Sequence, residues 1–146
     1  MAPVVPKLLA RPHVFLYRLT GGTVGGRLVG CPVLLLTTKG RRSGKLITVP
    51  LLYIPNGETQ VIIASYGGSP THPAWYLNLA SDPRCVVQIK RNRTGMVAET
   101  AGPDQRAVLW QQAIRMYPAY ADYQKRTSRE IPVVRLRARP VDELAP

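Results

Sequence analysis

The segment PVLLLTTKGRRSGKLITVPLLYIPNGETQVIIASYGGSPTHPAWYLNL, residues 32–79, decides the expected fold. Continuous apolar runs over 32–39 and 46–54 are typical of buried strands, and the short basic stretch between them predicts a hairpin. Pro55-Asn56-Gly57 favours a second tight turn, because Asn and Gly adopt positive φ at low cost. Residues 60–64 then form a third strand, so the segment predicts an antiparallel meander.

The rest of the chain is expected to add helices and further strands to this meander. Helices are predicted over 13–19, 73–79, 105–116 (after Pro103-Asp104) and 117–126 (broken at Pro118), and strands over 84–91, 96–101 and 131–138, with a turn at 92–95. The strands do not alternate with helices, so a parallel βαβ sheet is not expected. The predicted fold class is α+β, mainly β: a small antiparallel barrel with helices packed on it.

Composition narrows the kind of partner. The length predicts a single domain over 1–146, with residues 1–12 as a loose N-terminal arm. Lys and Arg number 20 against 8 Asp and Glu, a net charge of +12 that favours nucleic acid, a membrane surface or an acidic small molecule. Nucleic acid is not expected, because its recognition needs basic residues interleaved with exposed aromatics on one face, whereas the aromatics here gather in a loop and the C-terminal helix.

The sequence lacks the patterns of a membrane span, a signal peptide and several common kinds of site. No apolar stretch is long enough to span a bilayer, and Pro3, Pro6 and Pro12 interrupt the apolar core that a signal peptide needs, so a cytoplasmic protein is expected. Cys31 and Cys85 match no metal-ligand spacing and are expected as buried thiols. There is no phosphate-binding glycine motif and no serine triad, so neither a metal site nor a hydrolytic site is predicted.

Two loops carry residues that suit a ligand. The basic turn, residues 39–45 (KGRRSGK), sets Arg41 and Arg42 beside turn N–H groups, an arrangement that suits phosphate or carboxylate; a solvated hairpin turn is the alternative. The glycine-rich loop, residues 64–70 (ASYGGSP), follows the third strand. Its two glycines have no side chains, so a flat ligand can approach the loop backbone. An ordinary connecting loop is the alternative there.

Aromatic side chains follow these loops. Trp75 and Asn78 fall on one helix face, where Trp75 suits the core as well as a ligand wall. Tyr117, Tyr120 and Tyr123 recur every third residue as a polar-tipped stripe, which lines an amphipathic pocket or packs against the barrel. Cations beside a flat apolar wall are what a planar, anionic cofactor requires.

Together, the motifs LLLTTKGRRSGK, VPLLY, IIASYGGSPTHPAWYLNL and YPAYADYQKRTSREIPVV resemble the deazaflavin-dependent nitroreductase and quinone reductase family of actinobacteria. The resemblance extends from Tyr17 to Val134. It implies a split β-barrel and the cofactor coenzyme F420, an 8-hydroxy-5-deazaflavin. It also implies an oxidoreductase that transfers a hydride from the reduced cofactor to a quinone, enone or nitroaromatic acceptor, so that the partner is a small-molecule electron acceptor.

The resemblance also implies site residues. The basic turn would hold the cofactor's phosphate and acidic tail, and the neighbouring strands and short helix its ring; the residues are Arg41, Arg42, Ser43, Lys45, Thr48, Val49, Pro50, Ile63, Ala64, Ser65, Tyr66, Ala74, Trp75 and Asn78. Tyr66, Tyr120 and Tyr123 are implied as substrate-binding residues. Tyr120 and Ser65 are implied as catalytic groups that polarise the acceptor oxygen, with solvent as the alternative proton donor.

Two positions depart from the family pattern, and two other functions stay open. Ile47 stands where relatives usually carry arginine, with Lys45 as its replacement, and Tyr66 stands where lysine is common. An FMN-binding protein on the same barrel is one alternative, because a phosphate-binding turn serves either cofactor. A non-enzymatic deazaflavin carrier, which would bind the cofactor without turnover, is the other.

The N-terminal segment around Val14, Phe15, Leu16 and Leu19 carries a separate prediction. Its apolar residues, together with the net positive charge, predict weak peripheral contact with anionic lipid at the inner face of the cell membrane. Packing of the segment on the barrel is the alternative. The sequence predicts no oligomeric state.

Overall fold

One antiparallel sheet organises the protein, whose computed structural model describes residues 7–139. The strand order is β1-β2-β6-β7-β8-β5-β4, and β3 pairs with β2. The strands are β1 (Arg27–Leu28), β2 (Cys31–Lys39), β3 (Leu46–Leu52), β4 (Ile54–Asn56), β5 (Thr59–Ile63), β6 (Arg84–Ile89), β7 (Asn92–Thr100) and β8 (Val133–Ala138). Every pairing among them is antiparallel, as predicted.

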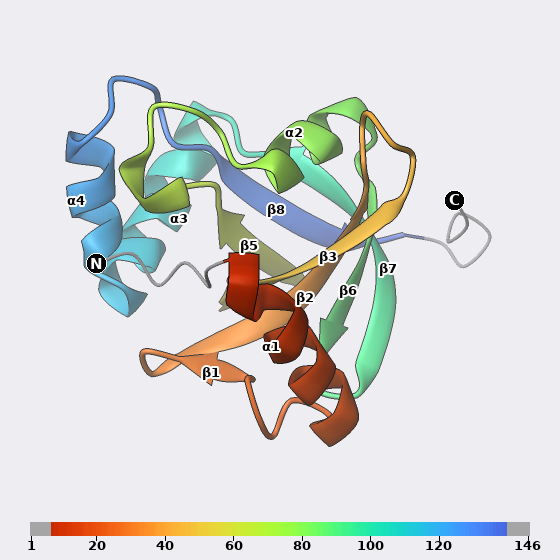
Figure 1. Ribbon diagram of the computed structural model, residues 1–146. Helices are drawn as coiled ribbons and strands as arrows, with labels where there is room; N and C mark the ends of the chain where they lie inside the picture. The colour runs from red at the N-terminus through yellow and green to blue at the C-terminus, as the bar shows by residue number, and fades with distance from the viewer. Residues whose placement is uncertain (1–6, 140–146) are drawn as a thin grey trace.

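Residues 46–56 join the two ends of the sheet. β3 pairs with β2 from Leu46 opposite Lys39 to Leu52 opposite Val33. After Tyr53 the chain continues as β4, which pairs with β5 at the other end of the strand order. Consecutive strands therefore connect both ends of the sheet and curl it into a barrel (Figure 1).

Strand β2 is buried on both faces, and this burial explains its continuous run of apolar residues. Leu34 and Leu36 belong to the cluster inside the barrel, and Val33 and Leu35 belong to a second cluster beneath the N-terminal helix. A strand with two buried faces loses the usual alternation of apolar and polar residues.

Within residues 7–139, four α-helices and one short 3₁₀ helix cover the sheet: α1 (Lys7–Thr20), η1 (Tyr66–Gly68), α2 (Ala74–Ser81), α3 (Pro103–Met116) and α4 (Ala119–Lys125). In Figure 1, α3 and α4 lie together at one end of the sheet, and α1 crosses it near β3. A third apolar cluster fills the space beneath α3 and α4, with Leu109 and Ala113 of α3 packed near Val61 and Ile63 of β5. The predicted barrel with packed helices is confirmed.

The N-terminal helix is longer than the sequence predicts. It begins at Lys7, not at His13, so residues 7–12 of the predicted loose arm are helical; residues 1–6 lie outside the described residues. Pro12 lies inside the helix, where it removes one backbone hydrogen bond. Val14 and Tyr17 pack into the cluster beneath the helix, and this burial outweighs the cost of the proline.

Two smaller differences have local causes. The β6–β7 turn falls at Lys90-Arg91, not over 92–95, because Lys90 adopts a positive φ of 55° and β7 starts at Asn92. β1 was not predicted, since it is only two residues long. Cys31 and Cys85 are free and buried, as expected. No helix within residues 7–139 has the length and apolar character needed to cross a bilayer.

Candidate active site

An apolar cavity of about 250 Å³ lies between β3, the end of β5, the glycine-rich loop and α2. Its walls are mostly aliphatic and aromatic, with a few hydroxyl and amide groups. The lining residues are Ala10, Thr38, Ile47, Val49, Pro50, Leu51, Leu52, Ile63, Ser65, Tyr66, Pro73, Ala74, Trp75, Asn78 and Tyr120. A largely apolar cavity with few polar groups is typical of a small-molecule or cofactor site.

The glycine-rich loop has unusual backbone geometry at the edge of this cavity. Tyr66 has a positive φ of 46°, which is uncommon for a residue with a side chain and occurs preferentially at functional sites. Gly68 has a φ of 81°, and a Cβ there would approach the Tyr123 carbonyl oxygen to 2.6 Å. The loop therefore needs glycine in order to pack closely on α4, a reason different from the close ligand approach that the sequence suggests.

The basic turn forms a separate cationic cleft of about 490 Å³ with the C-terminal end of α2. Its lining combines Lys39, Arg41 and Arg42 with Asp82. Asp82 is paired with Arg84 at 2.9 Å, and the hydrogen bonds from Arg84 lower the pKa of Asp82 to about 2. Within the part of the chain that the structure describes, no carboxylate pairs with Lys39, Arg41 or Arg42, so their charges face the cleft.

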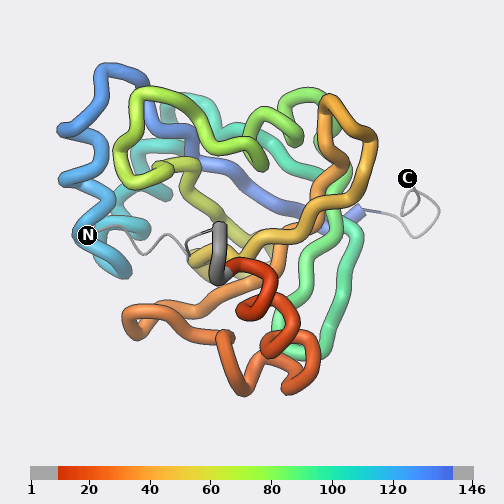
Figure 2. The backbone as a smooth tube through the Cα atoms, viewed as in Figure 1, coloured from red at the N-terminus to blue at the C-terminus, as the bar shows by residue number. Residues whose placement is uncertain are grey.

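Asn78 connects the cavity to the cleft. Its side chain is buried, and its Nδ2 donates to Thr38 Oγ1 at 3.2 Å. Its Oδ1 accepts from the backbone N and from Nη1 of Arg41, both at 3.2 Å. Figure 2 shows the result, with the β2–β3 turn lying beside the backbone of α2. The amide thus fixes the basic turn at one end of the apolar cavity.

The tyrosine stripe divides between the cavity and the core. Tyr120 lines the cavity and is only 4% exposed, and burial raises the pKa of its phenol, so the hydroxyl stays protonated at neutral pH. Tyr123 lies in the cluster beneath α3 and α4, and its hydroxyl is 3.0 Å from the Tyr117 hydroxyl. Tyr123 is not among the residues that line the cavity.

The structure brings most of the predicted site residues together. Nine of them line the cavity: Val49, Pro50, Ile63, Ser65, Tyr66, Ala74, Trp75, Asn78 and Tyr120. Arg41, Arg42 and Ser43 line the cleft. Lys45 and Thr48 face a groove between α1 and β3, and Ala64 is fully buried, so its side chain contributes packing.

Sequence reasoning missed several lining residues. Thr38 sits at the end of an apolar strand, and only its pairing with Asn78 marks it. Leu51 and Pro73 neighbour predicted residues on β3 and at the start of α2. Ile47, noted only as a departure from the family pattern, contributes to the cavity wall. No local signal distinguishes these side chains from ordinary core residues.

An apolar cavity next to a cationic cleft suits an apolar ring that carries an anionic extension. On an antiparallel barrel, this defines the class as a split-barrel protein with a site suited to a flavin-like cofactor. The chain belongs to the F420H(2)-dependent quinone reductase family, whose model matches residues 9–138. As a member of that family it is an oxidoreductase that uses reduced coenzyme F420.

Individual relatives agree with this assignment. An F420H(2)-dependent quinone reductase of Mycobacterium tuberculosis is 40% identical over 136 residues, covering 90% of this chain and 91% of that protein. A solved structure of an F420-H2 dependent reductase, FDR-A, is 37% identical with a TM-score of 0.67, covering 72% of this chain and 93% of that one. Another solved chain, described as a domain-swapped dimer, is 34% identical with a TM-score of 0.69 over 86% of this chain and 95% of its own.

Proposed function

We propose that the protein transfers a hydride from reduced F420 to a quinone, with the ring in the apolar cavity and the phosphate and acidic tail at the basic turn. The observation that carries this proposal is the direct connection of cavity and cleft through Asn78. When bound, the cofactor supplies the hydride. The protein then has to bind, orient and shield the reactants, which agrees with the lack of a nucleophile or metal motif in the sequence.

In this proposal the cationic residues hold the anionic end. Arg41 and Arg42 have guanidinium groups suited to phosphate oxygens, and Ser43 adds a hydroxyl donor in the same turn. Lys45 is two positions further along, in the groove that Ser43 also lines. A longer anionic tail would pass Lys45. The charge of Lys45 would then replace that of the arginine that relatives usually carry at the position of Ile47.

The apolar residues orient the ring and exclude water. Val49 and Pro50 of β3 form one wall, and Ile63 lies at the end of β5. Trp75 and Ala74 of α2 complete the enclosure. Such walls hold the reacting atoms at a fixed separation without contributing chemistry of their own.

Among the hydroxyl-bearing residues that line the cavity, Tyr120 and Ser65 are the two that we assign to the acceptor oxygen. Tyr120 is a neutral phenol whose hydroxyl has no partner among the described residues, so it can donate a hydrogen bond to that oxygen. Ser65, at the start of the glycine-rich loop, offers a second hydroxyl. Either group would polarise the acceptor carbonyl, and solvent would supply the proton that completes reduction.

Cofactor titration and turnover test the proposal. Oxidised F420 and FMN are titrated against the protein, and reduced F420 is then followed with a panel of quinones, enones and nitroaromatics. We expect tighter binding of F420 than of FMN, and oxidation of reduced F420 by quinones. Preference for FMN would support the FMN alternative, and tight F420 binding without turnover of any acceptor would support the carrier alternative.

We further propose that α1 makes peripheral contact with anionic lipid. Phe15 and Leu19 are 64% and 66% exposed, and Arg11 and Arg18 are exposed on the same helix. Exposed apolar side chains among cations favour an anionic interface. Replacing Phe15 and Leu19 with Ser should abolish co-sedimentation with phosphatidylglycerol vesicles at physiological salt. Absence of binding by the unmodified protein, or unchanged binding by the variant, would rule out this contact.

A further inference from the structure

Arg129 makes a concentrated set of hydrogen bonds behind the glycine-rich loop. Its Nε donates to the Ser69 carbonyl at 2.8 Å, and its Nη2 donates to the Ser65 carbonyl at 2.8 Å. Its Nη1 donates to the Ala64 carbonyl at 3.2 Å and lies 3.1 Å from His72 Nδ1. One guanidinium group thus binds both ends of the segment 64–72.

These contacts bear directly on the cavity, because Ser65 and Tyr66 are among its lining residues. Besides the close packing of Gly68 on α4 and a hydrogen bond from Ala64 N to the Pro132 carbonyl at 3.0 Å, the loop has few other contacts that fix its backbone. Its internal hydrogen bonds are those from Gly68 N to the Ser65 carbonyl and from Ser69 N to the Tyr66 carbonyl, and Arg126 adds one long contact, 3.4 Å, to the Gly67 carbonyl. A loop with a positive φ at Tyr66 keeps such geometry only where its surroundings enforce it.

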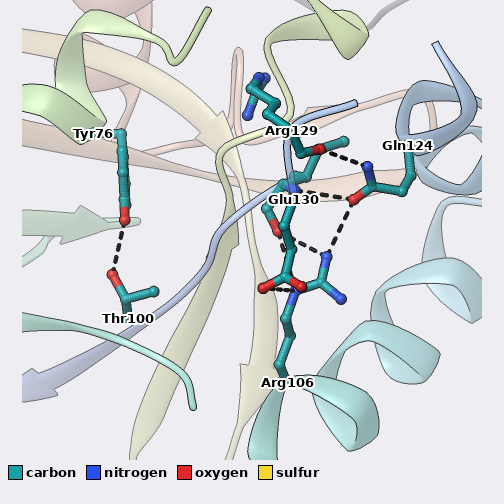
Figure 3. A network of polar contacts seen from close by, with 7 residues as sticks. Tyr76, Thr100, Arg106, Gln124, Arg129 and Glu130 are labelled. Carbon is teal, nitrogen blue, oxygen red and sulfur yellow. Dashed lines mark hydrogen bonds and ion pairs between the residues drawn. The ribbon is translucent and has the colours of Figure 1, made fainter. Parts of the chain in front are cut away.

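The main chain at Arg129 is itself fixed by a polar network on the other side. Gln124 Nε2 donates to the Arg129 carbonyl at 2.8 Å, while Gln124 Oε1 accepts from Ile131 N at 2.9 Å. Arg106 of α3 binds the same Gln124 Oε1 at 3.2 Å and forms an ion pair with Glu130 at 3.5 Å. Figure 3 shows the Arg129 side chain extending away from this network, so α3 and α4 anchor the residue whose guanidinium group anchors the loop. The Tyr76–Thr100 hydrogen bond in the same view lies apart from it.

The bonded carbonyls also set the direction of two N–H groups. In a trans peptide the N–H points opposite to the carbonyl, and no peptide bond in the described chain is cis. Because Arg129 binds the carbonyls of Ala64 and Ser65, the N–H groups of Ser65 and Tyr66 point away from Arg129. Neither N–H has a hydrogen-bond partner among residues 7–139. Both donors therefore stay available to a bound molecule, as does the Ser65 hydroxyl.

We propose that Arg129 is a positioning residue for hydride transfer: it fixes the Ala64–Ser65 and Ser65–Tyr66 peptides so that their N–H donors meet an oxygen of a bound reactant. The inference rests on the proposed function, which places the cofactor and the quinone in the cavity beside residues 65 and 66. Two oxygens could accept these hydrogen bonds: a quinone oxygen, which gains negative charge as the hydride arrives, or a carbonyl of the cofactor ring, which the donors would hold in position. Donors fixed in advance stabilise developing charge more than donors that must reorganise. Arg129 acts through the loop and touches no reactant itself.

Three variants test this role: Arg129→Ala, Arg129→Lys and, as a control that removes one positive charge elsewhere, Arg115→Ala. Arg115 is exposed in the last turn of α3, away from the cavity lining. Amide hydrogen exchange is measured over residues 64–72 in the cofactor-free protein. F420 affinity is measured by titration, and kcat and KM for a soluble quinone are measured with saturating reduced F420.

We expect Arg129→Ala to speed exchange over 64–72 and to lower kcat by about tenfold or more, because it removes several charge-assisted hydrogen bonds. If the donors meet the quinone oxygen, kcat falls while F420 affinity stays unchanged; if they meet the cofactor carbonyl, F420 affinity weakens as well. Lys, which lacks the planar fork, should restore only part of kcat. Added guanidinium ion at low concentration should raise kcat of Arg129→Ala and leave Arg115→Ala unaffected.

Other results would overturn the inference. A purely structural role predicts a lower Tm with unchanged kcat per folded, cofactor-loaded molecule and no response to guanidinium. Failure of the unmodified protein to oxidise reduced F420 with any quinone would instead reject the proposed function. In that case exchange and F420 titration still decide the role of Arg129: faster exchange with weaker binding supports positioning, and no change in either excludes it.

Discussion

The apolar cavity and the basic turn lie side by side but are built in opposite ways. The cavity takes its walls from β3, β5, α2 and α4, so no short segment contains it. The basic turn takes Lys39, Arg41, Arg42 and Ser43 from a single hairpin connection, and its cleft needs only the end of α2 in addition. The cavity is part of the core, whereas the turn is exposed.

This contrast separates stability from recognition. Residues of the cavity contribute to folding as well as to binding, because their side chains also belong to the apolar clusters. Cations of the turn have no carboxylate partner in the described chain and make few packing contacts. The two regions should therefore respond differently to substitution.

The largest expected effect is on the cavity wall. Trp75 is 8% exposed and packs in the barrel cluster, so Trp75→Ala should lower the free energy of unfolding by about 3–5 kcal/mol. Tyr66→Ala, at a lining residue that is 43% exposed, is the matched control and should change it by less than about 0.5 kcal/mol. Urea denaturation checks both. Equal losses of unfolding free energy in the two variants would show that the burial of a lining residue does not determine its contribution to stability.

The basic turn should show the reverse pattern. The double variant Arg41→Ala, Arg42→Ala should weaken F420 binding by about a hundredfold at low salt, from two lost charge-assisted contacts. The free energy of unfolding should stay nearly constant. Titrations across a salt series should show the difference from the unmodified protein shrinking as salt rises. Unchanged F420 affinity at low salt would show that the basic turn does not bind the anionic end of the cofactor.

Asn78 should combine both behaviours, since it joins the two regions. Asn78→Ala leaves Thr38 and Arg41 without their amide partner, so we expect a loss of about 1–3 kcal/mol in stability and about tenfold weaker F420 binding. A double-mutant cycle with Arg41→Ala checks the connection. The two affinity losses should be less than additive, and strict additivity would mean that the amide does not act through Arg41.

Tyr120 should have a smaller effect on chemistry. We expect it mainly to shape the cavity, with the Ser65 hydroxyl able to replace its hydrogen bond, so Tyr120→Phe should change kcat by no more than about threefold, whereas Tyr120→Ala should mainly raise the quinone KM. Tyr76→Phe, which removes a surface hydroxyl bonded to Thr100, is the control. A fall in kcat of tenfold or more in the Phe variant, with F420 affinity intact, would instead assign the phenol to stabilising the acceptor oxygen.

The smallest expected effect is a pH dependence from His72. Burial, and then the nearby Arg129 charge, lower the pKa of His72 below its ordinary value of 6.5, and the Tyr76 ring packs against the imidazole. As pH falls, His72 is therefore protonated at a higher pH in the unfolded chain than in the folded protein. The stability contributed by neutral His72 is complete above pH 6.5 and is lost as pH falls through the folded-state pKa.

Urea denaturation of the unmodified protein and of His72→Asn, from pH 8 to pH 5, measures this contribution. The stability difference between the two proteins should change in that range, with the unmodified protein losing more on acidification. Parallel curves would mean that His72 keeps its ordinary pKa in the fold.

Sequence patterns predicted the local parts of this structure better than the distant ones. The β2–β3 hairpin and the basic turn follow from contiguous apolar and cationic residues, and most of the lining residues followed from a family resemblance. Thr38 could not be recognised, because its partner Asn78 is 40 residues away. The same limit hid Arg129, whose hydrogen bonds reach back 60 to 65 residues to the glycine-rich loop.

Local rules also failed where packing overrides them. Prolines in the first twelve residues argue against a helix, yet burial of Tyr17 extends α1 back to Lys7. The Asn92–Gly95 sequence suits a turn, but the chain turns two residues earlier, where Lys90 N is held by the Tyr17 hydroxyl at 2.8 Å. The turn is thus positioned by a residue 73 places away in sequence.

That tyrosine also constrains the order in which the chain folds. The Tyr17 hydroxyl lies 3.1 Å from the Val33 carbonyl and 3.3 Å from the Gln88 carbonyl, and both oxygens belong to strands made after α1. During synthesis α1 leaves the ribosome first, but it cannot complete its native contacts until β6 has been made and has paired with β2. Such distant contacts slow folding. Newly made α1 therefore has to wait with its apolar face exposed until β6 is in place.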